Sequence, residues 1–266
     1  MKAHRLLTIL LASITAVVIA VFVLTITHDT RSSEQPTDPS SPTSPTVRTF
    51  PDVPPATLPP TIDLFGNRLE VTGDDEGAAL PQDPSTRPDP TRPDYLITPP
   101  AQMRWQRGWG GAALPVSGSD GPSRVAHGIA SGFAHTPQGA ALAAADALAR
   151  VLAAPEGVWQ QVVGERYYGG GRALIDRFAR SRERTPGAAR YVVVPDGVRI
   201  QSGYRDDLAI VQFATHDDVG YTVSTWPMAW IDGDWRVRVP NDIEALWGPG
   251  TSTSTLTGFG SWKAAP

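Results

Sequence analysis

The sequence contains no cysteine among its 266 residues. Disulfides, which exported domains often use when their core is small, are therefore excluded, and stability has to come from apolar burial. A large excess of basic charge is also missing, because the formal net charge is −4. A protein that coats nucleic acid needs such an excess to displace counterions, so we do not expect direct binding of nucleic acid.

Catalytic motifs are missing as well: neither G-x-S-x-G nor H-E-x-x-H occurs, and the glycine run 169–171 lacks the Lys-Ser/Thr of a phosphate-binding loop. We predict no catalytic, cofactor-binding or metal-binding residue and no enzymatic activity. His216, followed by Asp217 and Asp218, offers a cation ligand or a base, but the same residues suit an ordinary turn, which we favour. A Ser/His/Asp site assembled from distant residues stays open, because triads are recognised by geometry.

Residues 6–26 form a long apolar run without a charged side chain. About 20 such residues are enough for a helix to cross a bilayer. Lys2 and Arg5 precede the run, so the positive-inside rule places the N-terminus in the cytoplasm and the rest of the chain outside. A cleaved signal peptide is the alternative, but its apolar region spans only about 7–15 residues, and no cleavage site follows Ala20. We therefore predict a cytoplasmic tip and a single-pass membrane anchor over residues 1–29.

Proline, serine and threonine dominate residues 30–61, which we expect to form an extended spacer because they offer little apolar area. Residues 62–117 are more apolar and are predicted to wrap the domain surface, irregular except where 62–71 suits a hairpin or a strand. The side chains expected to pin this segment to the domain are Leu64, Phe65, Leu69 and Tyr95.

Residues 103–117 place two tryptophans among arginines, ahead of a glycine pair. One interpretation is that both indoles pack into the domain, as aromatic anchors usually do. A second is an exposed hot spot for a protein partner, and a third is a platform that stacks on sugar. The partner-binding candidates in this stretch are Arg104, Trp105, Arg107 and Trp109.

Residues 137–154 are predicted to form a helix rich in alanine, with Thr136 as N-cap and Pro137 in the first turn. Alanine combines high helix propensity with a small side chain, so this helix can lie very close to a sheet. Asp146 and Arg150 are expected to pair on its outer side. The predicted buried stripe is Leu142, Ala145, Leu148, Ala149 and Leu152.

Two further helices are predicted at residues 158–166 and 172–184, separated by a glycine hinge at 169–171. The second carries many arginines on its outer side. Such a face is usually solvated, and the alternative is contact with an acidic partner or with lipid headgroups. Its partner-binding candidates are Arg177, Arg180 and Arg184.

The remainder is typical of antiparallel strands, joined at the end by a hairpin turn at Asp232-Gly233. Pro227 falls inside a strand pattern and implies a bulge or an edge. Helices followed by strands indicate an α+β domain over residues 118–245, with the alanine helix packed on a curved sheet. Residues 246–266 are expected to be a loosely attached tail in which Trp262 docks, if any residue does. The predicted strands are 189–195, 197–204, 207–215 and 219–232.

This order of elements, with its closing AWIDGDWRVRV hairpin, resembles the cystatin-like, nuclear-transport-factor-2-like cone fold. On an anchored stalk it resembles the inner-membrane bridging subunits of conjugative and type IV secretion systems and their Gram-positive counterparts. From LFGNRLEV through WQRGWGGAALPVS to GFAHTPQGAALAA the sequence is similar to an uncharacterised actinobacterial family associated with integrative and conjugative elements. That similarity spans residues 62–240 and implies no mechanism, since a fold does not determine a function.

We therefore expect a membrane-anchored extracytoplasmic scaffold of a cell-envelope apparatus, with conjugative DNA transfer as the implied process. Its expected partners are the membrane and other envelope proteins, and self-association is left open. A cone-fold enzyme or small-ligand carrier that uses the sheet pocket is one alternative. A binder of cell-wall glycan that uses Trp105 and Trp109 is another. A scaffold should fill the pocket with side chains such as Trp230, Phe213 and Leu148, whereas a carrier needs a cavity.

Overall fold

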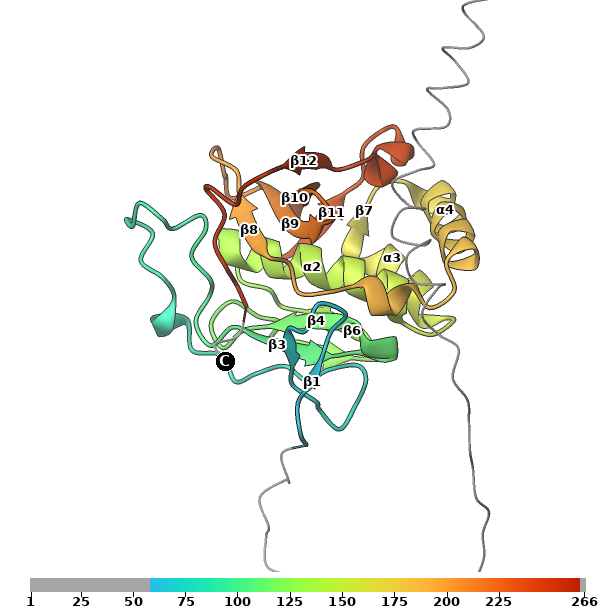
Figure 1. The fold of residues 1–266 in the computed structure, drawn as a ribbon, viewed down its shortest axis with the longest axis horizontal. Coiled ribbons are helices and arrows are strands. Elements are labelled where there is room, and N and C mark those ends of the chain that lie inside the picture. The colour runs from blue at the N-terminus through green and yellow to red at the C-terminus, as the bar shows by residue number, and fades with distance from the viewer. Residues whose placement is uncertain (1–57, 264–266) are drawn as a thin grey trace, which may run out of the picture. The chain divides into compact units, whose positions relative to one another are not determined.

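Helix α2 (Pro137–Ala153) runs through the middle of the domain in a computed structural model that describes residues 58–263 (Figure 1). Its start is as predicted: Gly139 N donates a hydrogen bond of 2.9 Å to Thr136 Oγ1, and Pro137 occupies the first turn. The large sheet packs on one side of α2, and a layer of small hairpins packs on the other (Figure 1). The helix is therefore enclosed from both sides.

The burial of α2 corrects the prediction of a one-sided helix. Of its 17 residues, 13 are buried, whereas Ala145, Leu148 and Leu152 of the predicted buried stripe are only half-buried. The predicted outer pair is wholly internal, with Asp146 0% and Arg150 1% exposed. Arg150 Nε donates to Asp146 Oδ1 at 2.7 Å, and its Nη1 donates to the Gly128 carbonyl at 3.0 Å. The pairing was predicted correctly, and its exposure was not, because the second layer covers that side.

The large sheet has six strands in the order β7-β11-β10-β9-β8, with β12 also paired to β10. All pairs are antiparallel except β7 with β11. The α+β class is thus confirmed. The bounds are β7 (Tyr167–Tyr168), β8 (Gly197–Ile200), β9 (Leu208–Asp217), β10 (Gly220–Ile231), β11 (Asp234–Arg238) and β12 (Thr251–Thr253).

The closing hairpin forms as predicted, since Ile231 pairs with Asp234 around the Asp232-Gly233 turn. In β11, Trp235 and Val237 are 0% exposed while the arginines between and after them face outward. Pro227 pairs with Ile210 without a bulge. On the other side of β10, β12 pairs with residues 221–223 and β11 with 228–231. Pro227 therefore occupies a local edge, where its missing N–H is harmless.

The N-terminal layer contains three short hairpins. The hairpin at residues 61–69 was predicted, whereas the hairpin at residues 104–116 corrects the expectation that the rest of the segment is irregular. Leu69 is fully buried, as predicted, but Leu64 and Phe65 point outward, 49% and 40% exposed. The β3–β4 hairpin packs against α2 (Figure 1). The strands are β1 (Thr61–Ile62), β2 (Arg68–Leu69), β3 (Arg104–Arg107), β4 (Ala113–Val116), β5 (Arg124–Ala126) and β6 (Ile129–Ser131).

Helices α3 (Val158–Arg166) and α4 (Gly171–Arg184) lie where they were predicted. The strand predicted at 189–195 is wrong: Ala188–Tyr191 forms a 3-10 helix. The following residues run between layers, where Ala113 N donates to the Val192 carbonyl at 2.9 Å. The β-branched composition of this stretch therefore reflects burial rather than sheet pairing.

The C-terminal segment is firmly attached, which corrects the prediction of a loose tail. Trp262 is 2% exposed, and its Nε1 donates to the Ile97 carbonyl at 3.0 Å. Trp105 Nε1 in turn donates to the Trp262 carbonyl at 2.8 Å. The segment thereby joins the N-terminal layer to the sheet, to which β12 belongs.

Within residues 58–263, no helix has the length and apolar character needed to span a bilayer. The predicted anchor at 1–29 and most of the predicted spacer at 30–61 lie outside the described residues. Residues 58–263 belong to one compact unit, in which the predicted wrapping segment 62–117 packs on the same core as residues 118–245.

Adjacent alanines on α2 supply a test of this packing. Ala144 is fully buried, so Ala144→Leu should lower the free energy of unfolding by about 1–3 kcal/mol through overpacking. Ala145 is half-buried beside an open pocket, and Ala145→Leu should cost less than about 1 kcal/mol. Denaturant unfolding of the two variants measures the difference. Equal losses would show that α2 is not enclosed as described.

Candidate functional site

An apolar pocket of about 150 Å³ opens between α2 and the large sheet. Phe213 and Leu148 line the pocket without filling it, and Trp230 lies elsewhere, stacked on His135 at 3.9 Å. The expectation that these three side chains fill the pocket is therefore wrong. The lining residues are Trp105, Ala113, Ala145, Leu148, Leu152, Tyr191, Val192, Val193, Pro195, Phe213, Thr215 and Ser224.

The chemistry of the pocket suits binding rather than reaction. Its lining includes no carboxylate, histidine, lysine or arginine. The Ser224 hydroxyl accepts a hydrogen bond from Trp226 Nε1 at 3.1 Å, and the Tyr191 hydroxyl accepts one from Arg190 at 2.8 Å. The Tyr191 and Ser224 hydroxyls are thus the polar side-chain groups beside Thr215 in a lining that is otherwise suited to an apolar group.

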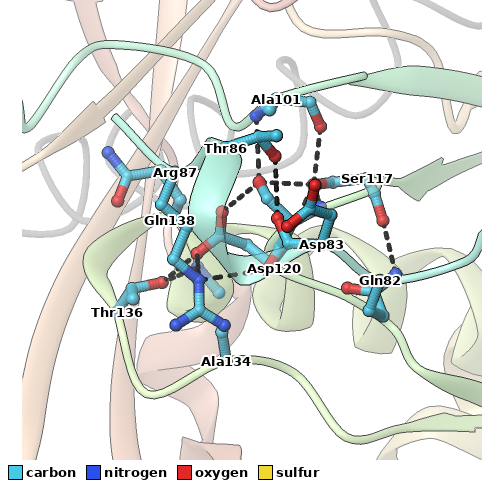
Figure 2. Close-up of polar contacts among 12 residues, drawn as sticks. Gln82, Asp83, Thr86, Arg87, Ala101, Ser117, Asp120, Ala134, Thr136 and Gln138 are labelled. Atoms are coloured by element: carbon cyan, nitrogen blue, oxygen red, sulfur yellow. Dashed lines mark hydrogen bonds and ion pairs between the residues drawn. The ribbon is translucent and has the colours of Figure 1, made fainter. Parts of the chain in front are cut away.

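A buried polar network surrounds Asp120, which is 1% exposed (Figure 2). Its carboxylate accepts hydrogen bonds of 2.6 Å from the hydroxyls of Ser119 and Thr136, and Arg87 Nε lies 3.5 Å away. The Ser117 hydroxyl accepts from the backbone N–H groups of Ser119 and Asp120 and donates to the Ala101 carbonyl. The network thus ties the segment before β3, the loop after β4 and the start of α2 to one another.

Sequence reasoning missed this network. A signal was available in SGSDGP at 117–122, a polar run directly after the apolar strand β4, but it equally suits an exposed turn. Asp120 contacts hydroxyl and guanidinium groups and no histidine, so the network lacks the base of a nucleophilic site. Its role is structural: buried polar groups need partners, and these partners fix three segments in place.

The Trp/Arg stretch serves the domain's own structure. Trp105 is 2% exposed, so its prediction as a partner-binding residue is wrong, and it cannot stack on glycan. Trp109 is half-buried beneath the guanidinium of Arg150, 5.7 Å from the ring centroid. Arg104 pairs with Glu70 at 3.3 Å and Arg107 with Asp75 at 2.9 Å. Packing, the first of the three interpretations, therefore accounts for both tryptophans.

The arginines of α4 fall into two groups. Arg177 donates to both carboxylate oxygens of Glu244, at 2.8 and 2.9 Å, and lies 4.2 Å from the ring centroid of Trp247. It therefore holds the 3-10 helix Ile243–Trp247 against α4. Arg180 and Arg184 are exposed and make no hydrogen bond or ion pair with the described part of the chain. Only these two α4 candidates are free for an external partner.

His216 takes part in a cluster that sequence reasoning did not find. Its Nδ1 lies 2.6 Å from Asp196 Oδ2, and Lys263 Nζ lies 2.7 Å from Oδ1 of the same carboxylate. Burial alone would raise the pKa of Asp196, but hydrogen bonds from Lys263 and His216 outweigh it and hold the pKa below its usual value. Asp217 ends β9 and Asp218 lies in the turn that follows, where Asp217 accepts from Val219 N at 2.9 Å. The cluster fastens the C-terminal segment to the sheet edge.

No group of three or more histidine, aspartate or glutamate side chains gathers into a metal-binding arrangement within residues 58–263. A second recess, of about 500 Å³, lies between the β5–β6 hairpin and α3. His127, Arg124 and Glu165 border it, and all three are exposed. This recess is an open polar surface without a buried polar group to orient a ligand.

The chain belongs to the family described as Domain of unknown function (DUF8175), which matches residues 70–261. No curated protein and no solved structure matches the chain. The matched range covers both the N-terminal hairpins and the large sheet. It therefore agrees with the packing of these two layers on opposite sides of α2.

Removal of the Asp120 carboxylate tests the buried network. Asp120→Ala leaves the hydroxyls of Ser119 and Thr136 without their acceptor and Arg87 without its ion-pair partner, and it should lower the free energy of unfolding by about 2–4 kcal/mol. Asp83→Ala, at an exposed position of the same region, should have a much smaller effect. Thermal or denaturant unfolding measures both. A loss at Asp120 no greater than at Asp83 would contradict the structural role.

The pH dependence of stability tests the Asp196 cluster. A carboxylate with a lowered pKa in the folded chain stabilises it above the unfolded value of about 3.9, and this contribution disappears as pH falls through the folded value. Asp196→Asn should therefore destabilise the protein near about pH 6, and this effect should shrink as the pH falls below about 3.9. Asp218→Asn, in the nearby exposed turn, is the control. A pH-independent effect at Asp196 would refute the assignment.

Proposed function

We propose that the protein is a membrane-anchored scaffold whose extracytoplasmic domain assembles with other envelope proteins, in an apparatus of the kind used for conjugative DNA transfer. The proposal rests on how charged side chains are distributed between the interior and the surface of the domain. Buried ionisable groups form internal pairs, as in Asp146–Arg150 and Arg166–Asp234, while exposed arginines remain on α4. A domain built in this way offers a charged surface rather than a reactive site.

The order of elements supports the resemblance to the cone fold. Helices α2 and α3 precede the short strand β7, α4 follows it, and strands β8 to β11 then form a meander. Strand β7 returns to pair in parallel with β11, the last strand of the meander. We take this arrangement as support for a bridging subunit, with the apolar run 6–26 as its anchor and the spacer 30–61 as its stalk.

The partner surface that we propose is the exposed side of α4 around Arg180 and Arg184. Arginine is favoured at protein interfaces because its planar guanidinium binds carboxylates in a bidentate manner. The expected partner is therefore an envelope protein with an acidic surface. The contact should weaken as ionic strength rises, because exposed charges are screened over about 10 Å at 0.1 M salt.

A second candidate, carriage of a small ligand, is favoured by the unfilled pocket of about 150 Å³. A cavity of this size and apolar lining accepts a molecule about as large as benzene. The lining includes no carboxylate, histidine, lysine or arginine, and it is mainly apolar, which favours carriage over catalysis at this pocket.

Site-specific photo-crosslinking in the native membrane tests the scaffold proposal. A photoreactive amino acid at position 180 or 184 should yield adducts with an envelope protein, and these should decline in high salt. The same group at exposed Arg205, on the loop between β8 and β9, serves as the control. Equal adduct yields at all three positions, or no protein adduct at any of them, would contradict the proposal.

A further inference from the structure

The turn Asp63–Asn67 is rigid and presents apolar side chains to water. The carboxylate of Asp63, itself 7% exposed, accepts hydrogen bonds from the backbone N–H groups of Phe65 at 2.9 Å, Asn67 at 2.8 Å and Val194 at 2.8 Å. Gly66 adopts a φ of +79°, which suits glycine and closes the turn. Leu64 and Phe65 are thus held outward by a buried anchor. Such preorganisation lowers the entropic cost of binding.

Exposed apolar side chains gather around this turn. Six large hydrophobic residues are exposed within residues 58–263, and four of them belong to the short segment 58–65. Contiguous apolar exposure on a soluble domain marks an interaction site, whereas isolated exposed residues do not. The four are Leu58, Ile62, Leu64 and Phe65.

The turn and the apolar pocket are neighbours. Asp63 binds the backbone of Val194, and the residues on either side, Val193 and Pro195, line the pocket. The Phe65 ring lies 3.8 Å from the ring of His216 in β9. A protruding apolar group and an apolar recess therefore occur side by side at one edge of the domain.

The two features also match in size and chemistry. An apolar cavity of about 150 Å³ accepts benzene, and the side chain of Phe65 ends in a ring of that size. The half-exposed Leu148 and Leu152 of α2 would gain a partner on contact with the ring. Each copy of the chain thus carries both halves of a complementary contact.

We propose that two copies of the chain associate by exchanging these turns, so that the Phe65 ring of each copy enters the apolar pocket of the other and Leu64 lies at its mouth. A patch that carries both halves side by side satisfies the requirement of a two-fold interface, in which each contact occurs twice and the assembly closes. The competing explanation is that the same turn inserts into a lipid bilayer. The dimer requires neither the membrane anchor nor the partner surface on α4.

The absence of cysteine makes a direct test available. Full-length copies that carry only Leu64→Cys are mixed in detergent with copies that carry only Thr215→Cys, and the mixed disulfide is followed under mild oxidation. Its rate should exceed by about tenfold that of a Tyr168→Cys and Thr215→Cys pair, because the complex raises the local concentration of the two thiols. Tyr168 is a matched control, 50% exposed on β7.

Two further substitutions distinguish a second copy of the chain from lipid as the binding partner of the turn. Phe65→Asp, or Ala145→Leu in the pocket, should each reduce the 64–215 rate to that of the control pair. Equal rates for the two pairs before any added substitution would overturn the proposal, as would a fast rate that survives Ala145→Leu. A control-level rate together with flotation on phosphatidylglycerol vesicles that Phe65→Asp abolishes would assign the turn to lipid instead.

Discussion

Enclosure of α2 on both sides is the constraint on which the rest of the structure depends. The helix separates the large sheet from the N-terminal hairpins, and both layers use it as their common core. Alanine makes this geometry available, because larger side chains on two opposite faces would force the layers apart. The same enclosure requires polar residues on the helix to find partners inside the domain, as Asp146 and Arg150 do.

Several features of the domain follow from this enclosure. The N-terminal hairpins cannot separate from the sheet without exposing α2, so the Asp120 network at the start of the helix acts as a fastening between layers. Trp105 and Trp262 form a second fastening at the C-terminal end of the chain. What remains for contact with other molecules lies on the outside: the arginines of α4, the apolar turn Asp63–Asn67 and the pocket beside it.

Local signals in the sequence predicted local structure well. Thr136 and Pro137 located the start of α2, and Asp232-Gly233 located the closing hairpin, because capping and turn chemistry act within a few residues. Burial on a second side of a helix depends on a segment far away in the chain. Periodicity therefore placed Arg150 outside and Leu148 inside, whereas Arg150 is buried and Leu148 is only half-buried. Leu142 and Ala149 of the same stripe are buried as predicted.

The candidate site was less predictable than the fold. A tryptophan flanked by arginines looks the same in the sequence whether it packs inside the domain or binds a partner. The contact between Trp105 and Trp262 shows that Trp105 packs inside the domain. The Asp120 network and the Asp196 cluster join residues that are distant in sequence, so no spacing between residues in the sequence indicates either of them. A free arginine surface can be found only after internal partners such as Glu244 are known.

Hydrogen exchange of the full-length protein in detergent tests the central claim most directly. If α2 is the shared core of both layers, amides of β3–β4, α2 and β9–β11 should exchange through one cooperative opening with a common free energy. Their protection should then fall together as denaturant is added. Exchange of the β3–β4 amides at a clearly lower free energy than those of α2 would show that the N-terminal layer separates alone, and would contradict this account.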